Sequence, residues 1–437
     1  VRLIKSDSPD MNPQIFLPRE EDHLYSVDHD PASSRFLVES NWKALNFRLL
    51  ETNLNNSSDK NEWKELIPHR EQVLLQSVIP FPEHLIIMER ENGLRKLKIL
   101  HKESKAEKEI NFNDPTYTTY LASNPEYYVD RFYFGYSSMR IPDSLFSVML
   151  SSGRKRLLKE AEVKGGFSSS DYKVDREFLT ARDGTQVPVS IVYKKNKFVK
   201  NGNPIFLYGY GSYGNSIDAG FSSSRLSLLD RGFIFAIAHV RGGQELGRSW
   251  YEDGKIFNKL NTFYDFIDVT KGLLDKGYGN KDRVYAGGGS AGGLLMGAIV
   301  NMEPNLYKGI ISNVPFVDVI TTMSDPSIPL TTGEYSEWGN PEVKEEFEYI
   351  MQYSPYDNIS WQEYPSILVT AGLWDSQVQY YEPAKYVAKL RDYNKGKNPI
   401  LMKVNMTAGH SGVSGRFESL KDLAMEYAFL LRIDRDK

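Results

Sequence analysis

One serine among glycines is the first candidate for chemistry. The stretch YAGGGSAGGLLM (285–296) holds Ser290 between Gly288 and Gly292, in the pattern G-x-S-x-G. An apolar, strand-like run leads in and a helix-like run leads out, which is the setting of a nucleophile elbow. A Cβ two residues before or after the serine would clash in so tight a turn. The pattern predicts that Ser290 is a nucleophile and that the Ala291 N–H faces a developing oxyanion, although a glycine-rich loop that only turns the chain would look similar.

A serine hydroxyl needs a base, and the chain offers one histidine in the right place. Of its seven histidines, only His410 follows Ser290, in the loop MTAGHSGVSGR. This loop comes after the strand-like run ILMKVNM and before the last helix-like stretch. In α/β hydrolases the triad runs in the order Ser, acid, His, with the base after a late strand. We therefore expect His410 to be the base; the alternative is an ordinary surface-loop histidine.

The acid of such a triad must lie between the serine and the histidine. Asp375 follows the strand-like run SILVTAG, so it lies at the carboxyl end of a strand. There it would fix the imidazole tautomer and stabilise the imidazolium. Asp318, after the short run ISNVPF, is the reserve candidate. The other aspartates considered are Asp325, Asp357 and Asp392, of which the last two resemble solvent-facing turn and helix residues.

A second oxyanion donor is expected after the third strand of the hydrolase fold. That stretch reads LYGYGSYG and lacks the HGGG pattern of many lipases. It offers a phenol instead, with Tyr210 as the first candidate and Tyr208 as the alternative. Either tyrosine could also serve only in packing.

The residues from about 173 onward must position this site. Buried strand-like runs alternate with helix-like stretches, which indicates a mostly parallel sheet with helices on both faces. Ligands of such sheets bind at the carboxyl ends of the strands. The strand-like runs are PIFLYGYG, GFIFAIAHV, RVYAGGG, GIISNVP, SILVTAG and PILMKVNM, and the helix-like stretches are NKLNTFYDFIDVTKGLLDKG, AGGLLMGAIVNM, YEPAKYVAKLRDY and FESLKDLAMEYAFLLRI.

Residues 1–172 have a different pattern of apolar and polar residues. Short apolar segments with period-two alternation are separated by polar turns, as in RFLVES and HLIIMERENG. Comparable segments recur about every 45 residues, a period typical of propeller blades with four short strands each. We predict an all-β partial propeller of about three to four blades over 1–172 and an α/β-hydrolase domain over 173–437. A plain β-sandwich is the alternative for the first part.

The composition excludes several classes of function. A net charge of -4 leaves no basic surplus for nucleic acid, and the absence of cysteine excludes disulfides, thiolate catalysis and Cys-based metal sites. No apolar run approaches the roughly 18 residues that span a membrane. The first residues also lack the apolar core of a signal peptide. We expect no nucleic-acid partner, no membrane partner, no metal or organic cofactor, and a cytoplasmic location.

Several motifs together resemble the prolyl oligopeptidase family of serine peptidases. They are YAGGGSAGG, GLWDSQVQYYEPAKYVAKLR, AGHSGVSGR, LYGYGSYG and VRGGQELGRSWYEDGK, with ELIPHRE and ERENGLRKLKI in the first part. The segment PFVDVITTMSDPSIPLTTGEYSEWGNP is similar to the oligopeptidase B branch, which cleaves short peptides after Arg or Lys. The resemblance implies an α/β-hydrolase domain capped by a seven-bladed propeller, and peptide hydrolysis through an acyl-enzyme.

The resemblance also implies roles for individual residues. The family triad matches Ser290, Asp375 and His410, and the oxyanion donors match Tyr210 and Ala291. Glu334, in TTGEYSEW, matches the acid that pairs with the P1 guanidinium or ammonium. Glu245, in RGGQELG, matches another acid near the substrate, toward P2. Taken without the resemblance, each glutamate would be a solvated loop charge.

Two departures from the family pattern change what we expect. The family has a second acid two residues after the first, where this chain has Ser336, and Glu337 would point elsewhere. Losing one carboxylate weakens the attraction for a basic side chain. The chain also has too few residues for seven blades and lacks the family's N-terminal segment, which implies the C-terminal part of a longer protein or a truncated homologue. Open strand edges would then favour self-association unless another segment covers them.

Three functions follow from these patterns. The first is a serine oligopeptidase whose partners are short peptides with a basic P1 residue. The second is an α/β-hydrolase esterase, which the triad permits but a carboxylate in the acyl pocket disfavours. The third is a catalytically impaired homologue that acts as a binding protein.

Overall fold

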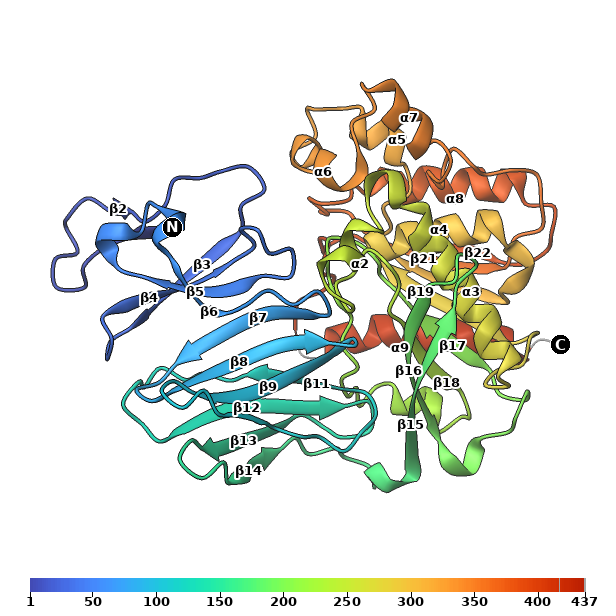
Figure 1. Ribbon diagram of the computed structural model, residues 1–437. Helices are drawn as coiled ribbons and strands as arrows, with labels where there is room; N and C mark the ends of the chain where they lie inside the picture. The colour runs from blue at the N-terminus through green and yellow to red at the C-terminus, as the bar shows by residue number, and fades with distance from the viewer. Residues whose placement is uncertain (416, 436–437) are drawn as a thin grey trace. The chain divides into compact units, whose positions relative to one another are not determined.

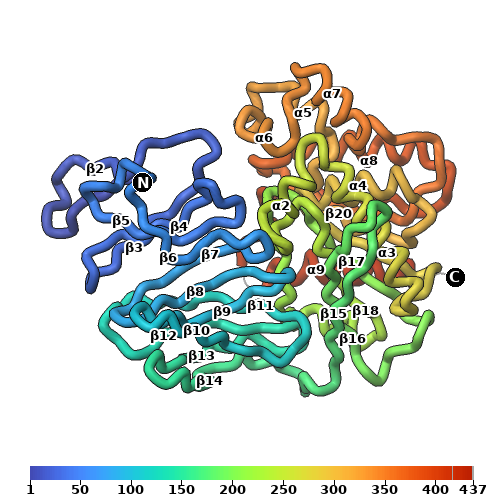
Figure 2. Tube along the Cα trace, viewed as in Figure 1, coloured from blue at the N-terminus to red at the C-terminus, as the bar shows by residue number. Residues whose placement is uncertain are grey.

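The computed structural model describes residues 1–415 and 417–435, which form two compact units (Figures 1 and 2). The first unit comprises Val1–Val163 and Glu245–Ser249, and the second comprises Lys164–Gln244 and the described residues from Trp250 onward. The boundary predicted from the sequence lies after residue 172, and β15 begins at Tyr172. No helix within the described ranges is long and apolar enough to cross a membrane.

The first unit consists of three four-stranded antiparallel sheets and one short hairpin-like pair, β1 (Arg2–Leu3) with β2 (Gln14–Ile15). In each four-stranded sheet, consecutive strands are neighbours. The sheets are β3 (Tyr25–Asp30), β4 (Arg35–Ser40), β5 (Arg48–Thr52) and β6 (Lys64–Ile67); β7 (Val73–Pro80), β8 (His84–Glu91), β9 (Leu94–His101) and β10 (Glu107–Glu109); and β11 (Tyr117–Leu121), β12 (Arg131–Ser138), β13 (Ser144–Met149) and β14 (Lys155–Glu160).

Alternation along β8 explains how these sheets stack. Successive side chains of a strand point to opposite faces of its sheet. Ile87 packs in a cluster with Leu37 and Leu49 of the first sheet, whereas its neighbour Ile86 packs with Phe132 of the third. The middle sheet is therefore buried on both faces, which is how the blades of a propeller pack on one another.

The second unit is built on one eight-stranded sheet with the order β15-β16-β18-β17-β19-β20-β21-β22. β15, β16 and β18 pair antiparallel, and all further pairs are parallel. The strands are β15 (Tyr172–Thr180), β16 (Gln186–Lys194), β17 (Ile205–Tyr208), β18 (Ile234–Ala238), β19 (Val284–Gly289), β20 (Gly309–Asn313), β21 (Ser366–Gly372) and β22 (Ile400–Asn405).

Helices cover both faces of this sheet, and β19 shows how. Tyr285 donates a hydrogen bond to Asp434 of α9, whereas a Cβ at Gly288 would lie 2.4 Å from the Gly292 carbonyl of α4. Residues three apart on a strand point to opposite faces. The helices are α1 (Leu226–Leu229), α2 (Arg248–Glu252), α3 (Leu260–Asp275), α4 (Ala291–Met302), α5 (Val319–Met323), α6 (Tyr335–Trp338), α7 (Lys344–Ile350), α8 (Tyr381–Tyr393) and α9 (Glu418–Arg435).

Candidate active site

Ser290 occupies the sharp turn between β19 and α4. Its backbone has φ 57° and ψ −119°, a conformation that non-glycine residues adopt only when the surrounding structure enforces it. The surroundings leave no room for side chains beside it, because a Cβ at Gly292 would lie 2.8 Å from the Gly209 carbonyl. Ala291 is the first residue of α4, so its N–H has no acceptor within the helix. The turn thus presents a hydroxyl and a backbone donor side by side.

His410 and Asp375 are in direct contact, although 35 residues separate them. Nδ1 of His410 lies 2.7 Å from Oδ2 of Asp375. Oδ1 of the same carboxylate accepts hydrogen bonds from the N–H groups of Gln377 and Val378, both at 2.9 Å. The aspartate is thereby fixed in the loop between β21 and α8, and it fixes one edge of the imidazole ring.

The electrostatics of Asp375 favour its charged form. Burial acts to raise its pKa, but the hydrogen bond to His410 and the two backbone N–H donors outweigh burial, so the pKa lies below the ordinary value. A carboxylate that stays ionised can stabilise an imidazolium next to it.

The other candidate acids have different partners. Asp318 is fully buried at the start of α5, where its carboxylate forms an ion pair with Lys385. Asp357 accepts a hydrogen bond from Ser354 at 2.6 Å. Asp325 caps its own exposed turn through Ser327, and Asp392 is an exposed residue of α8. Among the weighed aspartates, the structure brings Asp375 to the histidine.

Ser290 opens onto a cavity of about 230 Å³ in the second unit. Tyr210, Ala291 and Glu334 line the same cavity. Its remaining walls are mostly apolar and come from the segment after β17, from the β20–α6 region and from the loop after Asp375. They are Tyr213, Phe316, Thr322, Met323, Ile328, Leu330, Thr331, Trp338, Gln377 and Val378.

Tyr210 presents its phenol to the serine. The Ser290 hydroxyl forms a hydrogen bond with it, and burial, together with nearby Tyr208 and Glu337, raises the pKa of Tyr210 to about 12. The phenol is therefore a proton donor at neutral pH. Tyr208, the alternative donor, is the last residue of β17 and is not among the residues that line this cavity.

Glu334 also lines this cavity and is held by two donors. Its Oε2 accepts a hydrogen bond from the Tyr213 hydroxyl at 2.7 Å and one from Trp338 Nε1 at 3.2 Å. Ser336, the position where the resemblance implies a second acid, is exposed. Glu337 is buried and accepts from the Tyr213 N–H at 2.7 Å and from the Tyr251 hydroxyl at 2.5 Å. Glu334 therefore supplies the carboxylate that lines this cavity.

Glu245 belongs to the other compact unit. The segment Glu245–Ser249 is part of the first unit, where the Arg248 N–H donates to the Asn46 side chain at 2.7 Å. A Cβ at Gly247 would lie 2.9 Å from the same side chain. Glu245 is itself buried, and its predicted role near P2 stays a prediction.

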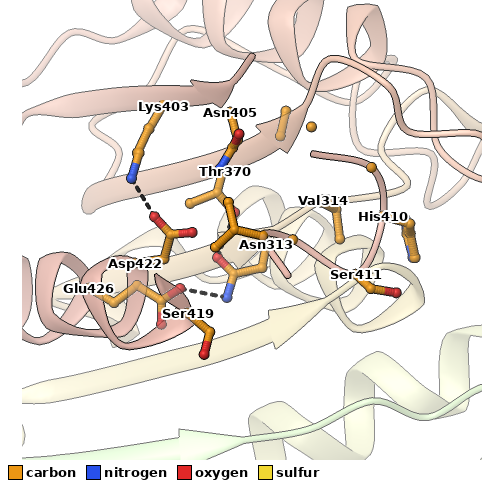
Figure 3. A pocket seen from close by; sticks show the side chains of 15 residues that line it. Asn313, Val314, Thr370, Lys403, Asn405, His410, Ser411, Ser419, Asp422 and Glu426 are labelled. Atoms are coloured by element: carbon orange, nitrogen blue, oxygen red, sulfur yellow. Dashed lines mark hydrogen bonds and ion pairs between the residues drawn. The ribbon is translucent and has the colours of Figure 1, made fainter. Parts of the chain in front are cut away.

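A second cavity, of about 220 Å³, borders His410 (Figure 3). Polar side chains of β22 and α9 line it, and an ion pair joins Lys403 to Asp422. Glu426 accepts a hydrogen bond from Asn313 at 3.0 Å. Two pairs of the polar groups that line this cavity are thus engaged with one another.

Sequence reasoning missed several residues that shape the site. Glu382, in the first turn of α8, is fully buried and accepts hydrogen bonds from the Asp318 N–H at 3.1 Å and the Thr322 hydroxyl at 2.5 Å. It thereby ties the cavity wall at α5 to the helix after Asp375. Tyr213, which donates a hydrogen bond to Glu334, and Lys259, which donates one to the Gly211 carbonyl, were also missed. A carboxylate in an otherwise apolar first turn was the available signal for Glu382.

Comparisons with known proteins agree with this architecture. The prolyl oligopeptidase family matches residues 219–435, and the N-terminal β-propeller domain of prolyl oligopeptidases matches residues 1–161. Dipeptidyl aminopeptidase BI of Pseudoxanthomonas mexicana is 46% identical over 97% of this chain and 59% of its own length. Protease 2 of Moraxella lacunata is 42% identical over 99% of this chain and 61% of its own length. The chain thus spans about three fifths of these curated relatives.

Solved structures give the same result. Oligopeptidase B from Leishmania major superposes with a TM-score of 0.92 at 40% identity, over 97% of this chain and 60% of that one. Oligopeptidase B from Trypanosoma brucei, with covalently bound antipain, gives 0.92 at 39% identity. The predicted α/β-hydrolase fold and partial propeller are confirmed, as is the predicted relationship to serine peptidases. The chain belongs to the prolyl oligopeptidase family of serine peptidases and resembles its oligopeptidase B members.

Proposed function

We propose that this protein is a serine peptidase that cleaves short peptides after Arg or Lys. One observation carries the proposal: Ser290 and Glu334 line the same cavity. A nucleophile and a single carboxylate that line one small, mostly apolar cavity suit a substrate that carries a cationic side chain next to its scissile bond.

The proposed reaction proceeds through an acyl-enzyme. The Ser290 oxygen attacks the carbonyl carbon while His410 takes the hydroxyl proton through Nε2, since Nδ1 faces Asp375. The Ala291 N–H and the Tyr210 phenol donate to the oxyanion. As the intermediate collapses, the C–N bond breaks and His410 protonates the leaving amine. Water then attacks the ester, His410 accepts its proton and returns one to Ser290, and the acid product leaves.

The P1 preference rests on the charge of Glu334. Burying a guanidinium or ammonium without a partner is costly, whereas a charge-assisted hydrogen bond to a carboxylate offsets that cost. Glu337 does not compete for this role because its oxygens already accept from Tyr213 and Tyr251. With Ser336 in place of a second acid, one carboxylate carries the attraction.

An esterase acting on fatty esters is less well supported. An apolar acyl chain in this cavity would lie against the carboxylate of Glu334 and desolvate it without supplying a cation. Small acyl esters without a long chain remain chemically accessible to the same nucleophile, so ester turnover alone does not separate the two functions.

The test compares matched substrates. Peptidyl-aminomethylcoumarins with Arg, Lys, norleucine or Glu at P1 keep the leaving group constant, and each is prepared with a blocked and with a free amino group at P2. We expect Arg and Lys to be cleaved at least a hundredfold faster than norleucine, and Ser290→Ala to cleave none. Equal rates for Lys and norleucine would contradict the basic specificity, and a preference for free amines would indicate dipeptide release, as the name of the Pseudoxanthomonas relative describes.

A further inference from the structure

Lys259 is a fully buried lysine that the catalytic scheme leaves unused. It is 1% exposed and lies at the start of α3. Its ammonium donates hydrogen bonds to the Gly211 carbonyl at 2.5 Å, to the Ser212 hydroxyl at 2.8 Å and to the Gly254 carbonyl at 3.2 Å. Three donors and three oxygens match, so the cation is satisfied without a direct carboxylate partner.

Two of these acceptors belong to the segment between the two tyrosines of the site. Gly211 follows Tyr210, which contacts the Ser290 hydroxyl, and Ser212 precedes Tyr213, which holds Glu334. The ammonium therefore binds the chain at the two positions that separate the oxyanion donor from the partner of the specificity carboxylate.

A buried carboxylate, that of Glu337, accepts a hydrogen bond from a backbone N–H of the same segment. Glu337 accepts from the N–H of Tyr213, while Lys259 binds the carbonyl and hydroxyl just before it. The charge of Glu337 also acts on Lys259. The segment Gly211–Tyr213 is thus held between a cation and an anion, each taking the polar groups that suit its sign.

The segment needs such support because its backbone is unusual. Gly211 has φ 74° and Tyr213 has φ 60°, which is uncommon for a residue with a large side chain. A Cβ at Gly242 would lie 2.0 Å from the Gly211 carbonyl, so the neighbouring loop leaves that carbonyl little freedom. Strained conformations of this kind persist only where surrounding contacts over-determine them.

We infer that Lys259 is a positioning residue that sets Tyr210 for oxyanion binding and Tyr213 for holding Glu334. It acts through the Gly211 carbonyl and the Ser212 hydroxyl and does not touch substrate. This inference rests on the proposed function, because it assigns Lys259 to the peptidase site. An apolar residue of similar volume would fill this buried space at a lower desolvation cost than a lysine does. We therefore assign the lysine a role in fixing the conformation of the loop.

A double-mutant cycle between Lys259 and Tyr210 tests the inference. Tyr210→Phe should lower kcat on the Arg substrate about a hundredfold, as loss of one oxyanion donor does. Lys259→Met, which keeps the stem and removes the ammonium, should lower kcat about tenfold or more because Tyr210 is displaced. The kcat of the double variant should lie within about threefold of the kcat of Tyr210→Phe alone. Once the phenol of Tyr210 has been removed, displacing that side chain has no further effect on the oxyanion.

The control replaces a lysine that does not touch the loop. Lys385 pairs with buried Asp318, and Lys385→Met should combine with Tyr210→Phe multiplicatively. Multiplicative loss for Lys259→Met as well would overturn the inference. If Tyr210→Phe alone leaves kcat unchanged, the proposed role of Tyr210 as oxyanion donor is wrong. That result is distinct from the multiplicative loss that would overturn the role of Lys259.

Ser212→Ala provides a second variant in case Lys259→Met does not fold. It removes one acceptor of the ammonium and leaves the lysine in place. We expect a severalfold loss of kcat that disappears in the Tyr210→Phe background. A loss of the same size in both backgrounds would contradict the positioning role. Circular dichroism and thermal unfolding establish that each variant compared is folded.

Discussion

The imidazole of His410 lies against Asp375, with Nδ1 2.7 Å from Oδ2, and the other carboxylate oxygen accepts two backbone N–H groups. The carboxylate is fixed on one side by its own loop and fixes the ring on the other. The protein therefore holds the tautomer with the proton on Nδ1, which leaves Nε2 for proton transfer in the proposed reaction.

Replacing Asp375 by Asn tests this relationship. The amide preserves the size of the side chain but can donate to Nδ1, which favours the wrong imidazole tautomer. We expect kcat to fall roughly 10³- to 10⁴-fold at pH 7, with KM changed little. The measurement is steady-state turnover of the Arg substrate by protein of unchanged thermal stability. A loss smaller than about tenfold would show that Asp375 does not orient the base.

Replacing Glu334 by Gln should change specificity more than chemistry. The amide keeps the volume of the cavity and removes the charge, so kcat/KM for Arg and Lys substrates should fall about a hundredfold while the norleucine substrate is affected less than about threefold. Ser336→Ala, two residues away and exposed, serves as the control and should behave as the unmodified protein. Equal losses on basic and neutral substrates would indicate a structural role for Glu334.

Glu382 should make folding stability depend on pH. Burial raises its pKa from 4.5 to about 7, with the charge of Asp318 adding to the effect, while the hydrogen bonds from Thr322 and the Asp318 N–H oppose it. The folded protein therefore binds this proton more tightly than the unfolded chain does. The contribution of this proton to the free energy of unfolding is complete below about pH 4.5 and is lost as the pH rises toward 7.

The comparison variant is Glu382→Gln, which cannot ionise. We expect the free energy of unfolding of the variant to gain ~3 kcal/mol relative to the unmodified protein between pH 4.5 and pH 7. Urea denaturation at half-unit pH steps measures this, with exposed Glu342→Gln as the control. A difference between the two proteins that stays constant with pH would contradict the assignment.

Much of the scaffold could be predicted because its signals are local. The stretches AGGLLMGAIVNM and YEPAKYVAKLRDY coincide with α4 and α8, and the six strand-like runs correspond to β17–β22. The antiparallel pair β15–β16 was not predicted. Residues at the start of β15 alternate between buried and exposed, like those in strands of the first part, so this strand's sequence does not distinguish the two units.

The contact between His410 and Asp375 could be predicted because the chain offers few choices. A single histidine follows Ser290, and Asp375 stands at the end of a strand-like run. The hydrogen bonds that hold the side chains of the site in place could not be predicted, because they join residues far apart in the chain. Tyr213 and Glu334 are separated by 121 residues, and Lys259 and Ser212 by 47. Lysine and tyrosine in such places carry no local pattern, and their roles follow only from the packing of loops around the carboxyl end of the sheet.

The most direct test of the account is active-site labelling of Ser290 combined with turnover. A fluorophosphonate should label the folded protein at Ser290, identified by mass spectrometry of the peptide containing GGGSAGG, and labelling should abolish cleavage of the Arg substrate in proportion. Ser290→Ala should show neither labelling at this peptide nor turnover. Turnover that survives in Ser290→Ala, or folded protein that neither reacts with the probe nor cleaves the Arg substrate, would contradict the proposal that this serine is a peptidase nucleophile.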